Sequence, residues 1–151
     1  MKNLRYTQMK DWIPLLIGVI LTVLFVVFST QIYELMYYDS EFSNEMYNEK
    51  LYFAISMITV AIAWLATILY YWVIDYLDRW YHWLIFLVVA VIATSLVAFY
   101  YPDSVFSDLN LDFTTQLWTF SLINACVGLV VYLIATISTK SLSSHCSATP
   151  F

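Results

Sequence analysis

A short turn between two long apolar segments constrains the fold of this chain more than any other feature. The turn, residues 73–83, reads VIDYLDRWYHW and is far too short to form a domain. The flanking segments, residues 51–74 and 83–101, are each about 20 residues long, enough for a helix to cross a hydrocarbon core of about 30 Å. We therefore expect an antiparallel pair of membrane-spanning helices, with the connecting turn on one side of the bilayer.

The composition indicates a helical membrane protein. Apolar residues make up 62% of the chain and charged residues only 11%, whereas a soluble domain is about half apolar and about a quarter charged. The sequence contains only 2 glycines and 3 prolines. It also lacks the strand-length alternation and repeated turn signals of a β-barrel. The predicted fold class is therefore an all-α integral membrane protein.

Two further apolar segments flank the central pair. The first includes Pro14, which suits the first turn of a helix, and we place its span at residues 13–36. Its basic start resembles a secretory signal, but the segment is too long and no small-residue cleavage site follows. The last span is expected at residues 116–139. Together the spans predict one antiparallel four-helix transmembrane domain, residues 1–140, followed by a short cytoplasmic tail, residues 141–151, that we expect to be disordered.

The lysines and arginines predict the orientation, because their excess in short loops marks the cytoplasmic side. Five of them fall on one side of the predicted spans and only Lys50 falls on the other. Both termini and the central turn should therefore be cytoplasmic, in a multi-pass protein of the bacterial inner membrane. The five basic residues are Lys2, Arg5, Lys10, Arg79 and Lys140. The acidic residues on the Lys50 side are Glu34, Asp39, Glu41, Glu45, Glu49, Asp103, Asp108 and Asp112.

Aromatic residues cluster at both ends of the predicted spans. We interpret them as anchors at the two membrane interfaces, where such residues are enriched. The cytoplasmic group is Trp12, Tyr70, Tyr71, Trp72, Trp80, Tyr81 and Trp83. The outer group is Tyr33, Tyr37, Tyr38, Tyr52, Phe99, Tyr100, Tyr101 and Trp118.

Charged residues outside the spans are candidate contact sites. The motif Asp108-Leu-Asn110-Leu-Asp112 resembles the start of a calcium-binding loop, but it is incomplete. Phe113 replaces the expected glycine and Thr119 the expected glutamate, so we favour an ordinary solvated loop. The outer acidic residues proposed to contact a partner or a cation are Asp39, Glu41, Glu45, Asp103, Asp108 and Asp112. The residues proposed to dock a cytoplasmic partner are Lys10, Arg79 and Lys140.

Small and weakly polar residues recur at helical spacing within the spans. In lipid, such residues permit close backbone approach and interhelical hydrogen bonds. They indicate either helix packing or a polar path within or between subunits, and we favour packing. Asn124 is the most polar residue deep in a span and needs a partner on a neighbouring helix or in a second copy. The residues predicted at a helix-packing or oligomer interface are Ala90, Thr94, Ala98, Ser121, Asn124 and Gly128.

The chain lacks the residues that chemistry within a membrane requires. No Asp, Glu, Lys, Arg or His lies in the middle of a predicted span, and Glu34, His82 and His145 lie at or beyond span ends. This pattern disfavours a proton-coupled exporter and a haem-binding cytochrome. Cys126 and Cys146 form no CxxC pair, and no hydrolase or nucleotide-binding motif is present. We therefore predict no enzymatic activity and no catalytic, cofactor-binding or metal-binding residues.

These features favour a non-enzymatic membrane protein that forms a homo-oligomer. It would act as a sensor, scaffold or effector subunit that couples the membrane to a cytoplasmic protein partner, without contacting nucleic acid. Small membrane subunits of this design occur in bacterial anti-phage defence and immunity systems, which is an analogy at the level of the fold. The alternatives are a pore-forming or holin-like permeabiliser, with Ser and Thr lining a central path, and a small-solute transporter.

Overall fold

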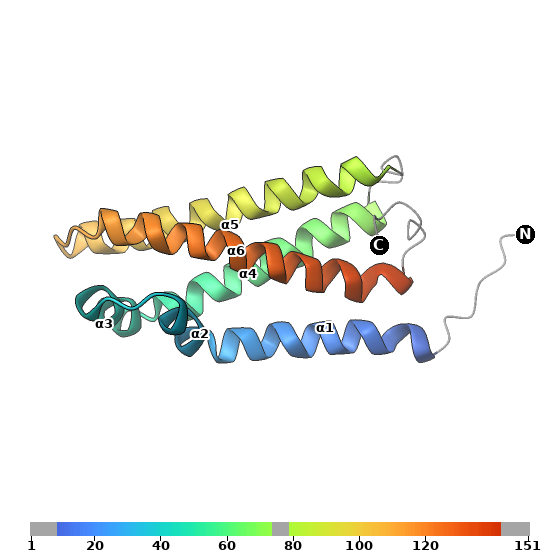
Figure 1. Ribbon diagram of the computed structural model, residues 1–151, viewed down its shortest axis with the longest axis horizontal. Coiled ribbons are helices and arrows are strands. Elements are labelled where there is room, and N and C mark those ends of the chain that lie inside the picture. Colours follow the sequence, from blue (N-terminus) through green and yellow to red (C-terminus); the bar gives the residue numbers. More distant parts are fainter. Residues whose placement is uncertain (1–8, 74–78, 143–151) are drawn as a thin grey trace, which may run out of the picture.

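The structure is a computed structural model that describes residues 9–73 and 79–142 (Figure 1). It is 90% helical, and the described residues form no strand. Residues 74–78 of the central turn lie outside the described residues, as do Lys2, Arg5 and residues 143–151 of the C-terminal tail.

The span predicted at residues 13–36 consists of two helices that meet at an angle. α1 (Met9–Val27) and α2 (Ser29–Met36) are bent by 71° at Phe28. α2 leaves the α1 axis because its Tyr33 side chain is buried among the other helices, where it is 1% exposed. The two helices together cover the predicted span, but they do not form the straight helix that its hydropathy indicates.

The acidic segment between the first and second spans forms a short helix. α3 (Ser40–Asn48) begins after Asp39, whose side chain accepts a hydrogen bond from Phe42 N at 3.2 Å. This is the usual capping of a helix N-terminus by a short polar side chain. Phe42 and Met46 lie one turn apart and are both 0% exposed. α3 therefore packs its apolar face onto the end of the bundle as a cap.

The second span starts at a sharp change of backbone direction. Lys50 has a φ of 55°, in the left-handed region that non-glycine residues seldom adopt. α4 (Leu51–Ile68) follows at once and continues into a π-helical segment, η1 (Leu69–Val73). Together they occupy almost all of the span predicted at residues 51–74.

The third helix is longer than the predicted span. α5 (Trp80–Asp108) continues through Pro102, the residue that follows the span predicted at residues 83–101. A proline inside a helix removes one backbone donor, and its ring clashes with the carbonyl four residues earlier. Pro102 is buried, however, one turn before Phe106, which is 1% exposed. Packing of this last part against neighbouring helices therefore stabilises the helix past the proline.

The fourth span is the helix around which the others pack. α6 (Thr114–Thr139) contacts α1, α4 and α5, and a short 3-10 turn, η2 (Lys140–Leu142), follows it. Half of the most apolar stretch of α6 is buried (50%), against 22% for α5. Its central position is visible in Figure 1.

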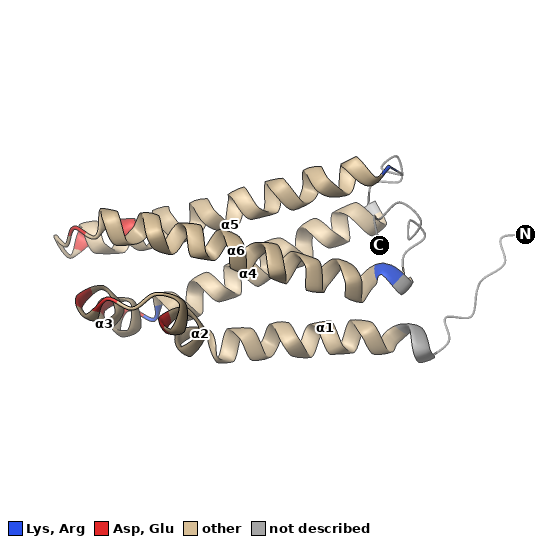
Figure 2. Cartoon of the chain, viewed as in Figure 1, with Lys and Arg blue, Asp and Glu red and all other residues tan. Residues whose placement is uncertain are grey.

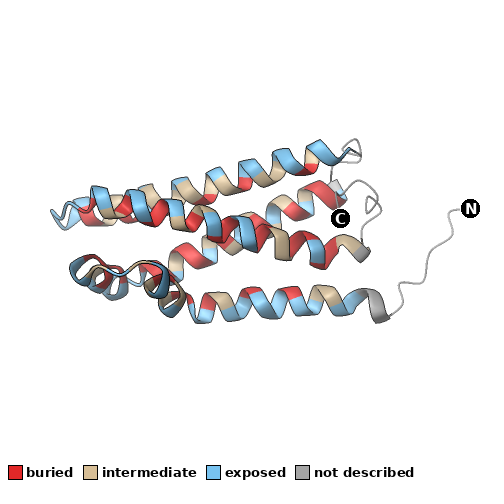
Figure 3. Cartoon of the chain, viewed as in Figure 1, coloured by how far each residue is buried: buried red, intermediate tan, exposed pale blue. Residues whose placement is uncertain are grey.

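The outward faces of the bundle are exposed (Figure 3), and large apolar side chains make up much of them. Ile20 of α1 is 57% exposed and Val89 of α5 is 59% exposed, for example. α4 with η1, α5 and α6 are each long and apolar enough to cross a membrane, and the bent α1–α2 pair makes a fourth candidate. Apolar surface of this extent is typical of helices that face lipid. The fold is that of a helical membrane bundle.

The charged residues whose side chains are described belong to backbone segments at the two ends of the bundle (Figure 2). All described acidic side chains, together with Lys50, lie at the end that carries α2, α3 and the α5–α6 connection, which we call the acidic end. Arg79 and Lys140 lie at the opposite end, which we call the basic end. Between these ends the described part of the bundle carries no charged side chain.

Candidate functional site

Asn124, in α6, hydrogen-bonds to three other helices. Its Oδ1 accepts a hydrogen bond from Tyr33 OH of α2 at 2.5 Å, and its Nδ2 donates to Thr94 O of α5 at 2.8 Å. Thr59 of α4 lies beside the amide, with its Oγ1 3.2 Å from Nδ2 and 3.4 Å from Oδ1. We call Tyr33, Thr59, Thr94 and Asn124 the polar centre.

The polar centre is enclosed by the bundle. Thr59, Thr94 and Asn124 are 0% exposed, and Tyr33 is 1% exposed. A buried amide needs partners for its oxygen and for its nitrogen, because an unpaired polar atom in hydrocarbon costs several kcal/mol. Both ends of the Asn124 amide have partners within this chain. Of the two kinds of partner considered from the sequence, the structure provides the neighbouring helix.

The α5–α6 interface combines hydrogen bonds with close backbone approach. Ser121 Oγ donates to Ser95 O at 2.8 Å, and the two hydroxyl oxygens are 2.8 Å apart. Gly128 lies against Thr94, where a Cβ added to the glycine would overlap the Thr94 hydroxyl and lie 3.2 Å from its Cβ. These two helices therefore approach as closely as they do because residue 128 has no side chain.

The predicted packing residues gather along one line of contact. Ala90, Thr94 and Ala98 are spaced by four residues and so lie on one face of α5, where they are 2%, 0% and 0% exposed. Ser121, Asn124 and Gly128 are buried on α6. The structure places all six of these residues in the interior of one bundle.

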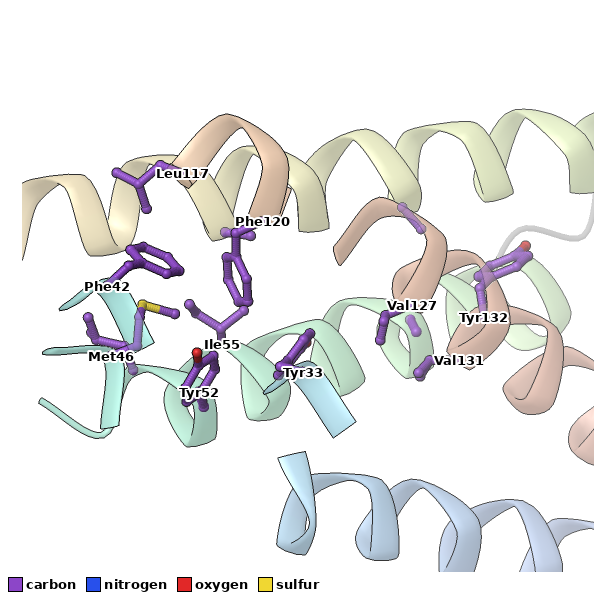
Figure 4. Close-up of a cluster of buried hydrophobic side chains, with 14 of the residues drawn as sticks. Tyr33, Phe42, Met46, Tyr52, Ile55, Leu117, Phe120, Val127, Val131 and Tyr132 are labelled. Atoms are coloured by element: carbon purple, nitrogen blue, oxygen red, sulfur yellow. The ribbon is translucent and has the colours of Figure 1, made fainter. Parts of the chain in front are cut away.

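Aromatic side chains fill the space between the polar centre and α3 (Figure 4). The Phe120 ring centroid lies 5.0 Å from that of Tyr33 and 6.0 Å from that of Phe42. Tyr52 stacks on Tyr33, with centroids 5.8 Å apart and planes inclined by 17°. Such pairs add about 0.5–1.5 kcal/mol each beyond the burial of their area. α3 is therefore joined to the polar centre through continuous aromatic packing.

Several residues interpreted as interfacial anchors are instead part of the core. Their exposed fractions range from 0% to 6%, whereas Trp80 and Trp118 are 60% and 61% exposed, as anchors should be. Helix rotation decides which aromatic residues near a helix end face neighbouring helices and which face lipid. The buried residues are Tyr33, Tyr52, Tyr70, Tyr71 and Trp83.

Tyr33 is the member of the polar centre that the sequence did not reveal. A tyrosine next to Glu34 at the end of an apolar segment has the pattern of an anchor, and only the bend at Phe28 brings it to Asn124. Thr59 carries a usable signal, because Ser56, Thr59 and Ala63 are small residues spaced three or four apart on one face of α4.

Two of the outer acidic residues accept backbone hydrogen bonds at the starts of helices. Asp39 caps α3, as described above. Asp112 Oδ1 accepts hydrogen bonds from Thr114 Oγ1 at 2.7 Å and from Thr114 N at 3.1 Å, at the start of α6. The hydroxyl bond, followed by the backbone bond, lowers the pKa of the Asp112 carboxyl below its ordinary value. These two carboxylates are therefore used in the fold itself.

The remaining outer acidic residues do not converge on a site. Glu41 and Asp108 are exposed, and Glu45 and Asp103 are half-buried, on α3 and α5. Among the described residues no three His, Cys, Asp or Glu side chains lie close enough together to hold a metal ion. The calcium-like motif in the α5–α6 connection is therefore not assembled as a metal site within the described residues.

Two of the three predicted docking residues have described side chains, and both lie at the basic end. Arg79 is exposed at the start of α5, with its Cζ 6.0 Å from the centre of the Tyr81 ring. Lys140 is half-buried at the start of η2. Lys10 lies in the first turn of α1, but its side chain is outside the described residues.

The fold and the polar centre define a class, a helical membrane bundle closed around neutral, hydrogen-bonded side chains. No protein-family model, curated protein or solved structure matches this chain. Its function therefore has to be inferred from its own residues and their geometry.

Proposed function

We propose that this protein is a non-enzymatic membrane subunit, a scaffold or sensor that holds a cytoplasmic protein at the membrane through its basic end. The polar centre is the observation that carries this proposal. The strongest polar groups of the spans join four helices and are neutral, whereas proton relays and ion paths use ionisable residues at this depth. The interior is therefore suited to holding the bundle together.

The opposite charges of the two ends supply the difference between a cytoplasmic face and an outer face that such a subunit needs. In this proposal the basic end, with both termini, faces the cytoplasm of a bacterial cell, and the acidic end faces outward. Exposed Arg79 and half-buried Lys140, both at the basic end, would attract an acidic surface of the partner. The subunit would act as a homo-oligomer, whose repeated basic ends would increase the avidity for the partner.

The proposal is tested by recovery of the partner from solubilised membranes. A soluble protein should co-purify with the tagged full-length chain, as measured by quantitative mass spectrometry. The Arg79→Gln/Lys140→Gln variant should recover about tenfold less of it, because two ion pairs with the partner would together contribute about 1.4 kcal/mol. Lys50→Gln is the matched control, since it removes one cation from the acidic end, and it should recover the partner unchanged.

Two results would contradict the proposal. Recovery of this chain alone, from membranes of cells in which it is expressed, would remove the docking role. Leakage of a small dye from liposomes that contain the purified chain would favour the pore alternative, whereas the proposed subunit should leave them sealed.

A further inference from the structure

A recess opens at the acidic end between α2, α3 and α4. It has a volume of about 290 Å³, and its lining includes Thr30, Asn48 and Lys50. Tyr47 and Phe53 also line it and are 65% and 52% exposed. No carboxylate is among the described residues that line it, although it lies at the end where the acidic residues gather.

Lys50 is the cation of this recess, and it has no described counterion. It is the one basic side chain that the structure describes at the acidic end. Its side chain is exposed, and it forms no ion pair with a described carboxylate. A lysine that forms no ion pair with a described residue, at the end where the described carboxylates gather, is available to an anion from outside the chain.

The recess offers hydrogen-bond donors. Lys50 supplies an ammonium group, Asn48 an amide and Thr30 a hydroxyl. Lys50 is also the N-cap residue of α4, and its side chain does not cap that helix. The positive end of the α4 dipole therefore adds to the ammonium charge. Hydrogen-bond donors with no carboxylate among them are suited to bind the oxygens of a phosphate group.

The level at which the recess lies in the bilayer indicates the source of that phosphate. The apolar span Leu51–Trp72 begins at the residue after Lys50, so the ammonium lies where the hydrocarbon core ends and the lipid headgroups begin. The exposed rings of Tyr47 and Phe53 are typical of the same level. Free anions would have to approach across an acidic surface, but a lipid phosphate reaches the recess by lateral diffusion within the bilayer.

We propose that this recess binds the phosphate of a membrane phospholipid, with Lys50 as its principal contact. The proposal requires the bundle to lie in a membrane. It depends neither on the docking role proposed above nor on the leaflet that the acidic end faces, so either proposal can fail without the other.

The test is native mass spectrometry of the full-length chain in detergent, titrated with dioleoylphosphatidylglycerol. The variant is Lys50→Gly, because glycine adopts the left-handed backbone of this position without cost and only the side chain is lost. Its affinity for the lipid should fall about fivefold, the factor that corresponds to about 1 kcal/mol for one lysine near a lipid headgroup. Asn110→Gly is the matched control, since Asn110 has a φ of 57° outside the recess, and its affinity should not change.

Two further ligands separate the possible sources of binding. Dioleoylglycerol has the same acyl chains without the phosphate and should bind far more weakly. Inorganic phosphate at millimolar concentration should not displace the phospholipid. Equal lipid affinity of Lys50→Gly and the unaltered chain would overturn the proposal. Equal binding of dioleoylglycerol would overturn it in favour of an acyl-chain groove, and displacement by inorganic phosphate would overturn it in favour of a free-anion site.

Discussion

At the scale of single residues, the amide of Asn124 links α6 to α2, α4 and α5 with neutral hydrogen bonds. Each such bond in a membrane protein contributes about 0.6 kcal/mol on average and at most about 1.7 kcal/mol, because separated helices in lipid also find partners. The hydrogen bonds from this one side chain to three helices therefore contribute about 1–3 kcal/mol to the stability of the bundle. This is similar to the loss of stability caused by many single substitutions in a protein core.

Replacing Asn124 with leucine should lower the free energy of unfolding by about 1–3 kcal/mol. The reason is that Tyr33 OH and Thr59 lose their partner in the closed core. Reversible denaturation in sodium dodecyl sulfate, followed by circular dichroism, measures the change. Asn44→Leu, at an exposed position of α3, is the matched control and should have almost no effect.

The size of the complex distinguishes the two partners considered for Asn124, which are a neighbouring helix and a second copy of the chain. With its bonds inside one chain, the Asn124→Leu variant should keep the oligomeric state of the unaltered protein in nanodiscs. A smaller complex with an unchanged free energy of unfolding would instead place the bond of Asn124 between two copies.

At the scale of elements, contact between α5 and α6 depends on the absence of a side chain at residue 128. Without a hydrophobic force between helices in lipid, close packing and hydrogen bonds hold them together. Hydrogen bonds between Ser95 and Ser121 join the two helices on the side toward the acidic end. On the side toward the basic end, Gly128 lets α6 approach Thr94 closely. A methyl group at residue 128 has no space unless Thr94 or the helix moves.

The Gly128→Ala variant should therefore be less stable by about 1–3 kcal/mol, the usual cost of adding volume to a packed core. Thr94→Ala removes the hydroxyl that the new methyl group would overlap. The double variant should consequently lose less stability than the two single variants added together. Unfolding in sodium dodecyl sulfate gives all three values, and strict additivity would show that Thr94 is not the obstacle.

Two short elements, α2 and α3, are defined by packing more than by their own sequences. α2 has 8 residues and α3 has 9, which is too few for a stable isolated helix in water. Tyr33 of α2 and Phe42 of α3 both reach the aromatic packing around Phe120. These contacts hold α2 across the α1 axis and α3 over the end of the bundle.

At the scale of the whole molecule, the bundle has two ends of opposite charge. The described residues between these ends are uncharged and mostly apolar. Transfer of a charged side chain to the middle of a bilayer costs about 2.5–3.5 kcal/mol on insertion scales. A bundle whose described charges all lie at its ends avoids that cost in only one placement, with its long axis across the membrane. Which end faces the cytoplasm then depends on the basic residues.

Cysteine labelling tests that orientation. In a Cys126→Ala background, native Cys146 reports on the C-terminal tail. Asn44→Cys, with Cys146 also replaced by serine, reports on α3. A membrane-impermeant maleimide should label residue 44 in intact cells and Cys146 only after permeabilisation, because the positively charged end remains in the cytoplasm. The reverse pattern would invert the proposed orientation and remove the basis of a cytoplasmic partner at Arg79.

The sequence by itself determined the class of fold, the approximate positions of the spans and the separation of charge. Hydropathy and charge are properties of short stretches, and insertion into lipid responds to each stretch almost independently. The packing residues of α5 and α6 could also be predicted, since Ala90, Thr94 and Ala98 are small residues that share one helix face. Each of these features needs only the neighbouring residues in the chain.

The tertiary structure alone decided the bend at Phe28, the continuation of α5 through Pro102 and the choice of partners for Asn124. It also decided that Tyr33 and Tyr52 belong to the core, although their positions near helix ends are typical of interfacial anchors. These outcomes depend on how each helix is rotated and on what lies against it. Such contacts join residues far apart in the chain, and no local pattern of hydropathy or charge records them.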